Sequence, residues 1–138
     1  MKAIIVAGLV VVIGVMMAPS PTAAYHSFAA EFDADKPIEL TGIVTKVEWV
    51  NPHVWFYINV QNDDGTTTNW GAEMGPPHGL QRRGWRRETL KIGDEVSVAG
   101  SLAKNGTPRL NARTITLTAT GGRPGETLDA NSSQATTP

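Results

Sequence analysis

Short runs in which apolar and polar residues alternate are the feature that most constrains the fold of this chain. In residues 53–60 the apolar side chains include every second position, namely Val54, Phe56, Ile58 and Val60. A period of two places successive side chains on opposite faces of an extended strand. Residues 62–65 read Asn-Asp-Asp-Gly, which is hairpin-turn chemistry, and alternation resumes in residues 66–74. We therefore expect an antiparallel hairpin here.

Three further strands and one short helix are predicted from the remaining pattern. Residues 38–49 predict a long first strand whose apolar phase changes near Gly42, which is typical of a bulge or a bend. Residues 95–102 and 109–117 predict two strands joined by a hairpin turn at Lys104-Asn105-Gly106. Gly75-Pro76-Pro77 ends the preceding strand, and residues 78–83 predict one or two helical turns.

This order predicts an all-β fold, in which three strands, a short helix and two more strands follow one another. A long first strand bent at a glycine matches a small five-stranded OB-like Greek-key barrel, with the short helix between strands three and four. An open five-stranded sheet or a small sandwich is the alternative. We take the barrel to comprise residues 38–120.

The two ends of the chain predict segments outside the barrel. Residues 1–24 have a short positive start, an apolar run at 3–17 and a small, helix-breaking stretch, as in a secretory signal peptide cut after Ala24. The 15-residue apolar run is shorter than the roughly 20 residues that span a bilayer. An uncleaved anchor is the alternative. We expect residues 25–37 to pack on the barrel and residues 121–138, with Leu128 as their one large apolar side chain, to form a disordered tail.

Composition narrows the compartment and the partners. The chain has no Cys, which excludes disulfides and Cys-ligated zinc. Without residues 1–24 it carries 11 basic and 13 acidic side chains, a balance that argues against general binding to nucleic acid or to a membrane surface. The predicted signal peptide indicates an exported protein, periplasmic or secreted, with no stable membrane span after cleavage. Its predicted partner is a small molecule or a periplasmic protein, and not nucleic acid.

Several motifs together resemble one protein family. They are Tyr25-His26-Ser27-Phe28, Leu40-Thr41-Gly42-Ile43, Asn51-Pro52-His53-Val54-Trp55, Asn69-Trp70, Arg82-Arg83-Gly84-Trp85 and Leu90-Lys91-Ile92-Gly93-Asp94. With them the chain resembles, over residues 25–117, the bacterial family of small exported proteins called domain of unknown function 6152. The resemblance implies a periplasmic protein with a small β-barrel, and it brings no activity. His78 departs from the family, whose members tend to carry a polar residue other than histidine there.

The histidines are the candidate metal ligands. Imidazole suits copper, zinc, iron and nickel, so His26 and His53 form the candidate site, with copper or another divalent transition metal as the candidate cofactor. No pair has the spacing His-x-x-x-His. The alternative is that His53 hydrogen-bonds the backbone beside Pro52 and fixes the entry to its strand. A cut after Ala23 would make His26 the third residue, which suits square-planar copper(II) or nickel(II), whereas a cut after Ala24 removes that geometry.

Aromatic and arginine side chains form the candidate ligand surface. Trp55 and Tyr57 share one face of their strand, and OB-folds bind ligands on that surface. The residues assigned to the surface are Trp55, Tyr57, Trp70, Trp85, Arg82 and Arg83. In the alternative, the N-terminal segment covers the aromatic side chains as a minor core. The arginines are then solvated and pair with Glu88, Asp94 or Glu95.

No catalytic residue is predicted, because the chain has no nucleophile elbow, no Gly-rich phosphate loop and no His-Glu-x-x-His motif. The sequence therefore favours an exported binding or adaptor module whose ligand is not assigned. The alternative is a periplasmic, copper-type metal-handling protein that uses His26 and His53. An enzyme ranks last, since only a histidine or an acid with a raised pKa would serve as its base.

Overall fold

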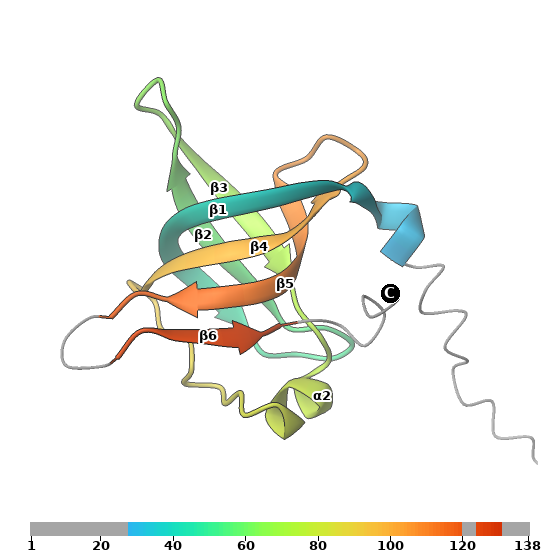
Figure 1. Ribbon diagram of the computed structural model, residues 1–138, viewed down its shortest axis with the longest axis vertical. Coiled ribbons are helices and arrows are strands. Elements are labelled where there is room, and N and C mark those ends of the chain that lie inside the picture. The colour runs from blue at the N-terminus through green and yellow to red at the C-terminus, as the bar shows by residue number, and fades with distance from the viewer. Residues whose placement is uncertain (1–27, 120–123, 131–138) are drawn as a thin grey trace, which may run out of the picture.

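The computed structural model describes residues 28–119 and 124–130 (Figure 1). Residues 28–31 are helical and lead into the barrel. The elements that follow are β1 (Phe32–Glu48), β2 (Trp55–Gln61), β3 (Thr67–Glu73), α2 (Pro77–Arg82), β4 (Glu95–Ala103), β5 (Arg109–Leu117) and β6 (Glu126–Asp129). The predicted signal peptide at 1–24, His26 and the last part of the predicted tail lie outside the described residues.

The strands close into a ring. β1 pairs antiparallel with both β2 and β4, β2 pairs with β3, and β4 pairs with β5. β3 and β5 then run side by side in parallel, with Gly71, Ala72 and Glu73 opposite residues 109–111. The resulting circuit β1-β2-β3-β5-β4 is that of the five-stranded Greek-key barrel known as the OB-fold, with α2 between β3 and β4. The predicted all-β, OB-like barrel is confirmed.

The long first strand pairs with two neighbouring strands, and a glycine lies where the pairing passes from one to the other. β1 pairs with β4 as far as Ile43 and with β2 from Ile43 onward. A Cβ atom at Gly42 would lie 2.4 Å from the carbonyl oxygen of Asn59, so a side chain there would push β2 away. The register shift itself lies between Val44 and Lys46, slightly after the predicted position. This bulge lets one strand bend around the barrel.

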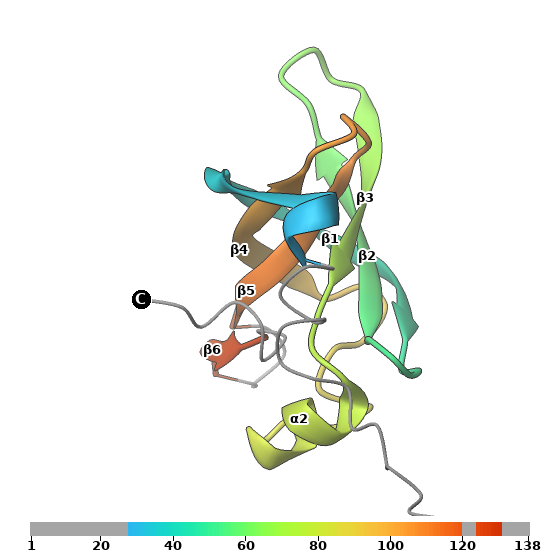
Figure 2. The same ribbon diagram turned by 90° about the vertical axis from the view of Figure 1, so that its right-hand side faces the viewer.

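The alternating residues fill the barrel as their period requires. The inward row of β2, which includes Phe56 and Ile58, is fully buried. Leu80 of α2 and Trp85 of the following loop are also fully buried and belong to the same apolar cluster. Burial of one such aliphatic or aromatic side chain contributes roughly 1.5–3 kcal/mol. α2 lies at one end of the barrel (Figures 1 and 2), and from there these two side chains complete its core.

The strand count is six rather than the predicted five. β6 pairs antiparallel with β5, and the following Ala130 is fully buried. The prediction placed this segment in a disordered tail because Leu128 is its one large apolar residue. The contacts that order it are tertiary: Leu128 packs against the core, and Trp85 Nε1 donates to the carbonyl oxygen of Asp129 at 2.7 Å. At the other end, β1 begins at Phe32, within the segment that was expected only to pack on the barrel.

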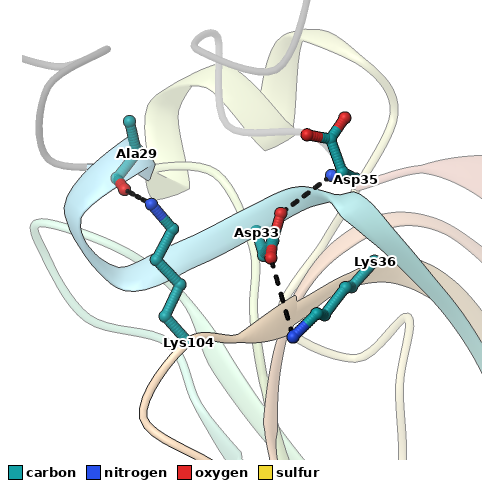
Figure 3. A network of polar contacts seen from close by, with 5 residues as sticks. All are labelled: Ala29, Asp33, Asp35, Lys36 and Lys104. Carbon is teal, nitrogen blue, oxygen red and sulfur yellow. Dashed lines mark hydrogen bonds and ion pairs between the residues drawn. The ribbon is translucent and has the colours of Figure 1, made fainter.

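The helical residues at the start are tied to the turn between β4 and β5 (Figure 3). Lys104 Nζ donates to the carbonyl oxygen of Ala29, and the Lys104 backbone N–H donates to that of Glu31 at 2.9 Å. Nearby, Asp33 accepts a hydrogen bond from the Asp35 backbone N–H at 3.0 Å. These contacts set the first residues of the described chain beside the β4–β5 turn, where they form one wall of a cleft.

No helix within residues 28–119 and 124–130 has the length and apolar character needed to cross a membrane.

Candidate ligand-binding site

Two aromatic rings lie on the outer face of the barrel. Trp55 and Tyr57 belong to β2, and each is half-buried, while the residues between and beside them point into the core. Gly71 of β3 lies opposite Tyr57, and a Cβ atom there would lie 3.2 Å from the Tyr57 ring. The missing side chain at this position leaves room for the rings to lie against β3. The sequence correctly grouped Trp55 and Tyr57 on one face.

A cationic side chain lies over each of the two rings. The guanidinium carbon of Arg109 lies 4.5 Å from the centre of the Trp55 ring, and Lys46 Nζ lies 5.4 Å from the centre of the Tyr57 ring. Such contacts are worth about 0.5–2 kcal/mol. Lys46 also pairs with Glu48, which accepts a hydrogen bond from the Tyr57 hydroxyl at 3.2 Å. The hydrogen bond from Lys46 lowers the pKa of Glu48, and burial together with the Glu48 charge raises the pKa of Tyr57. Polar groups at the Tyr57 end therefore satisfy one another.

Arg109 has no such internal partner. Among the described residues no carboxylate lies within ion-pair distance of its guanidinium. The side chain is half-buried and lines a cleft of about 360 Å³, together with residues 30–32 and 103–105. A guanidinium presents five N–H donors in a planar fork that matches the two oxygens of a carboxylate or phosphate. Stacking on Trp55 fixes the plane of that fork, so the cleft is arranged to receive an anionic group.

His53 flanks the same surface and is paired with an acid. Its Nδ1 lies 2.7 Å from Oε1 of Glu73, whose residue lies opposite Trp55 and is buried. The hydrogen bond to Glu73 raises the pKa of His53; burial opposes this rise, and the charges of Glu73 and Glu31 add to it. His53 therefore takes a carboxylate as its partner, not the backbone beside Pro52 as in the sequence-based alternative.

The pairing of His53 has a pH consequence. Because folding raises its pKa, the protonated imidazole stabilises the fold below about pH 6.5, and this contribution is lost as the pH rises through the folded-state pKa. We expect the free energy of unfolding in urea to fall by about 1 kcal/mol over that range. The Glu73→Gln variant should lose most of this slope. An equal slope in that variant would assign the pH dependence to other groups.

The metal site predicted from sequence receives no further ligands from the described chain. Within residues 28–119 and 124–130, no three His, Asp or Glu side chains gather closely enough to hold a metal ion. His26, the proposed second ligand, lies outside these residues. His78 is exposed on α2.

The other residues assigned to the ligand surface lie elsewhere. Trp70 is opposite Ile58, on the inward side of β3, and packs half-buried against the core. Trp85 is fully buried, so a ligand on the surface cannot contact it. Arg82 and Arg83 lie where α2 ends, and Arg83 Nη1 is 3.6 Å from Oδ1 of Asp129. The structure thus separates this group from Trp55 and Tyr57.

Sequence reasoning missed Arg109, Lys104 and Lys46. The proximity of Arg109 and Lys46 to the aromatic face follows from the parallel pairing of β3 with β5 and from the β1 bulge, neither of which has a local signal. The one available signal was that Arg109 opens a strand directly after the Lys104-Asn105-Gly106 turn. In a closed barrel this turn lies near the β2–β3 surface that binds ligands.

Among the solved structures with a similar fold are three that match between 62% and 68% of this chain. The mitochondrial single-stranded DNA binding protein Rim1 of S. cerevisiae is 17% identical, covering 62% of this chain and 96% of its own, with a TM-score of 0.49. The N-terminal domain of PriB from Thermoanaerobacter tencongensis is 19% identical, covering 62% and 98%, with a TM-score of 0.45. A ZRD-deleted TiaS in complex with agmatine is 20% identical, covering 68% and 26%, also with a TM-score of 0.45. No curated protein matches the chain.

One prediction about partners requires correction. Charge balance and the predicted signal peptide were taken to exclude nucleic acid. One of the similar structures is a single-stranded DNA binding protein, which overturns this exclusion. Net charge describes the whole chain, whereas contacts to a ligand depend on the few side chains at a site.

The sequence comparison agrees with the resemblance that the motifs indicated. The model of a family of unknown function, DUF6152, matches residues 12–111, which is well over half of the 138 residues. This range includes β1 to β4 and the start of β5, with Trp55 and Arg109 among its residues. The chain therefore belongs to the DUF6152 family.

Proposed function

We propose that this protein is an exported binding module that holds an anionic group of its ligand on Arg109. The observation that carries the proposal is a half-buried guanidinium, stacked on Trp55 and lining a cleft, with no carboxylate partner in the described part of the chain. Such a group loses part of its hydration without an internal replacement. A ligand that supplies two anionic oxygens would restore it, with charge-assisted hydrogen bonds.

The rest of the cleft fits the same chemistry. Lys104 adds a second cation against the single carboxylate of the lining, Glu31, and Phe32 and Ala103 supply apolar surface. A volume of about 360 Å³ lies within the range of roughly 300–1,000 Å³ typical of small-ligand sites. A carboxylate or phosphate next to a flat apolar body would satisfy all three features. A phosphate of a single-stranded nucleic acid offers the same group, with bases that stack on aromatic or guanidinium planes.

The proposal is tested by following side-chain N–H signals of Arg109 and Trp55 in nitrogen-15 NMR spectra. The probes are benzoate, phenyl phosphate and a single-stranded oligothymidylate. We expect an anionic probe to shift both signals, and Arg109→Gln to weaken its binding at least about tenfold, because charge-assisted hydrogen bonds contribute about 1.5–3 kcal/mol. The protein for this experiment is purified from the periplasmic fraction. Cleavage of the predicted signal peptide after Ala24 would make Tyr25 its first residue.

The control is Arg113→Gln, which removes an exposed arginine from the same strand and should leave binding unchanged. Benzyl alcohol, which lacks the anionic group, should shift neither signal. Shifts with the oligothymidylate alone would identify nucleic acid as the source of the phosphate. Equal binding of every probe by wild type and Arg109→Gln would contradict the proposed site.

A further inference from the structure

Basic side chains are concentrated in the loop that follows α2. Residues 82–91 hold five of the 12 basic side chains of the chain and one of its 13 acidic side chains, Glu88. The remaining residues are therefore strongly acidic on balance. We call the basic group the arginine platform. Its members are Arg82, Arg83, Arg86, Arg87 and Lys91.

The fold fixes the backbone of the loop that carries the arginine platform. Trp85 and Leu90 of the same loop are buried in the core, while the residues on either side of Trp85 are exposed. Trp85 is held further by its backbone N–H, which donates to the carbonyl oxygen of Leu80 at 3.1 Å. Arg86 donates to the carbonyl oxygens of Gln81 and Trp85. The tryptophan anchors the loop, so its backbone has little ordering left to lose on binding, and the cations on it face solvent.

Much of this charge has no internal partner. Within the part of the chain that the structure describes, no carboxylate lies within ion-pair distance of Arg82, Arg87 or Lys91. Their charges are therefore available to an anionic partner. A surface with many negative charges would engage several of them at once.

An exposed aliphatic side chain adjoins the arginine platform. Ile92 follows Lys91 and is 75% exposed, the highest value among the exposed large hydrophobic residues of the described chain. Its turn is fixed, because Gly93 has a φ of 93° and its N–H donates to the carbonyl oxygen of Val44 at 2.8 Å. An aliphatic group held out beside cations fits a lipid surface, where it enters the boundary between headgroups and acyl chains. Nucleic acid would engage the cations but would favour aromatic rings for its bases.

We infer that residues 82–92 form a docking surface for an anionic lipid membrane. Basic residues near such a surface each contribute about fivefold in affinity, and the attraction falls off within a Debye length. This surface lies at the α2 end of the barrel, whereas the Arg109 cleft lies beside the β4–β5 turn at the opposite end (Figures 1 and 2). Docking would leave that cleft open to solvent, and the inference does not depend on the proposed ligand.

The test is co-sedimentation of the full protein with vesicles of phosphatidylcholine alone or mixed with phosphatidylglycerol. We expect binding to the mixed vesicles, little to phosphatidylcholine, and a strong decrease at high salt. Arg87→Glu should weaken binding to mixed vesicles about tenfold or more, since it removes one attraction and adds one repulsion. Lys36→Glu changes the net charge equally at an exposed site outside residues 82–92 and should have little effect. Ile92→Ser should weaken binding, and Ile43→Ser, at another exposed isoleucine, should not.

The outcomes separate the alternatives. Any uncleaved protein keeps the N-terminal apolar run in every variant. If that run were what binds the vesicles, Arg87→Glu and Lys36→Glu would bind equally well, and this result would overturn the inference. Equal binding to both kinds of vesicle, or to neither, would also overturn it. Binding to an oligothymidylate that Arg87→Glu abolishes, without binding to vesicles, would assign the arginine platform to nucleic acid instead.

Discussion

Trp85→Ala is expected to destabilise the fold by about 3–5 kcal/mol, the usual cost of truncating a fully buried aromatic side chain. Trp85 has no exposed surface, and it joins the loop after α2 to the core of the barrel. The variant would also remove the hydrogen bond from Nε1 to the carbonyl oxygen of Asp129, which fixes β6. Urea unfolding followed by circular dichroism measures the loss directly.

Two further tryptophan variants separate the contributions. Trp85→Phe keeps most of the apolar volume and removes the N–H donor, so we expect it to cost less than Trp85→Ala, at about 1–3 kcal/mol. Trp70→Ala truncates a tryptophan that is only half-buried and should likewise cost less than Trp85→Ala. A loss below about 1 kcal/mol for Trp85→Ala would show that the loop after α2 does not complete the core.

Gly100→Ala should destabilise the barrel by about 1–3 kcal/mol or more, the usual cost of forcing extra atoms into a packed site. An added Cβ atom would lie 2.0 Å from the carbonyl oxygen of Asn111 and 2.9 Å from its carbon, both backbone atoms that no rotamer change can move. The register of β4 against β5 shifts between Ala99 and Gly100, so the added atom would fall at an irregular point of the pairing. The same urea experiment measures the effect.

Gly79→Ala is the matched control. It makes the same chemical change within α2, where the added Cβ atom would meet only the Pro76 ring, at 3.5 Å and beyond. Alanine is favoured over glycine in a helix by about 1 kcal/mol, so this variant should be neutral or slightly more stable. Similar losses at Gly79 and Gly100 would mean that close strand approach does not explain the requirement for glycine.

The barrel was predictable because its signals are local. Each of the five predicted strands has an apolar period or a flanking turn that can be seen within about ten residues, and β5 has the predicted bounds. β6 has neither signal, since its order depends on Trp85 and on the edge of β5. The prediction placed the register shift at Gly42, two residues before its observed start after Val44. A glycine can be seen in the sequence, whereas a bulge that contains no glycine leaves no such signal.

The candidate site was only half predictable for the same reason. Trp55 and Tyr57 lie two residues apart on one strand, so their common face follows from the period. Arg109 reaches Trp55 only because β5 runs parallel to β3, and this contact joins residues 54 positions apart. Trp85 was grouped with the surface because its arginine neighbours are polar. Which side of a loop enters the core depends on the shape of the cavity that it covers.

The parallel pairing of β3 with β5 closes the barrel next to Arg109, and it links ligand binding in the cleft to the opening of the barrel. Only Gly71 to Glu73 pair with residues 109–111, so the seam that turns a curved sheet into a closed barrel is three residue pairs long. Arg109 begins β5 at this seam, and its guanidinium crosses to Trp55 of β2 on the other side of β3. A ligand bound to the guanidinium in the cleft would hold in place the side chain that connects β5 to β2 across this shortest pairing of the barrel. Ligand binding would then slow the local opening of this seam, so the bound protein would be more rigid there than the free protein.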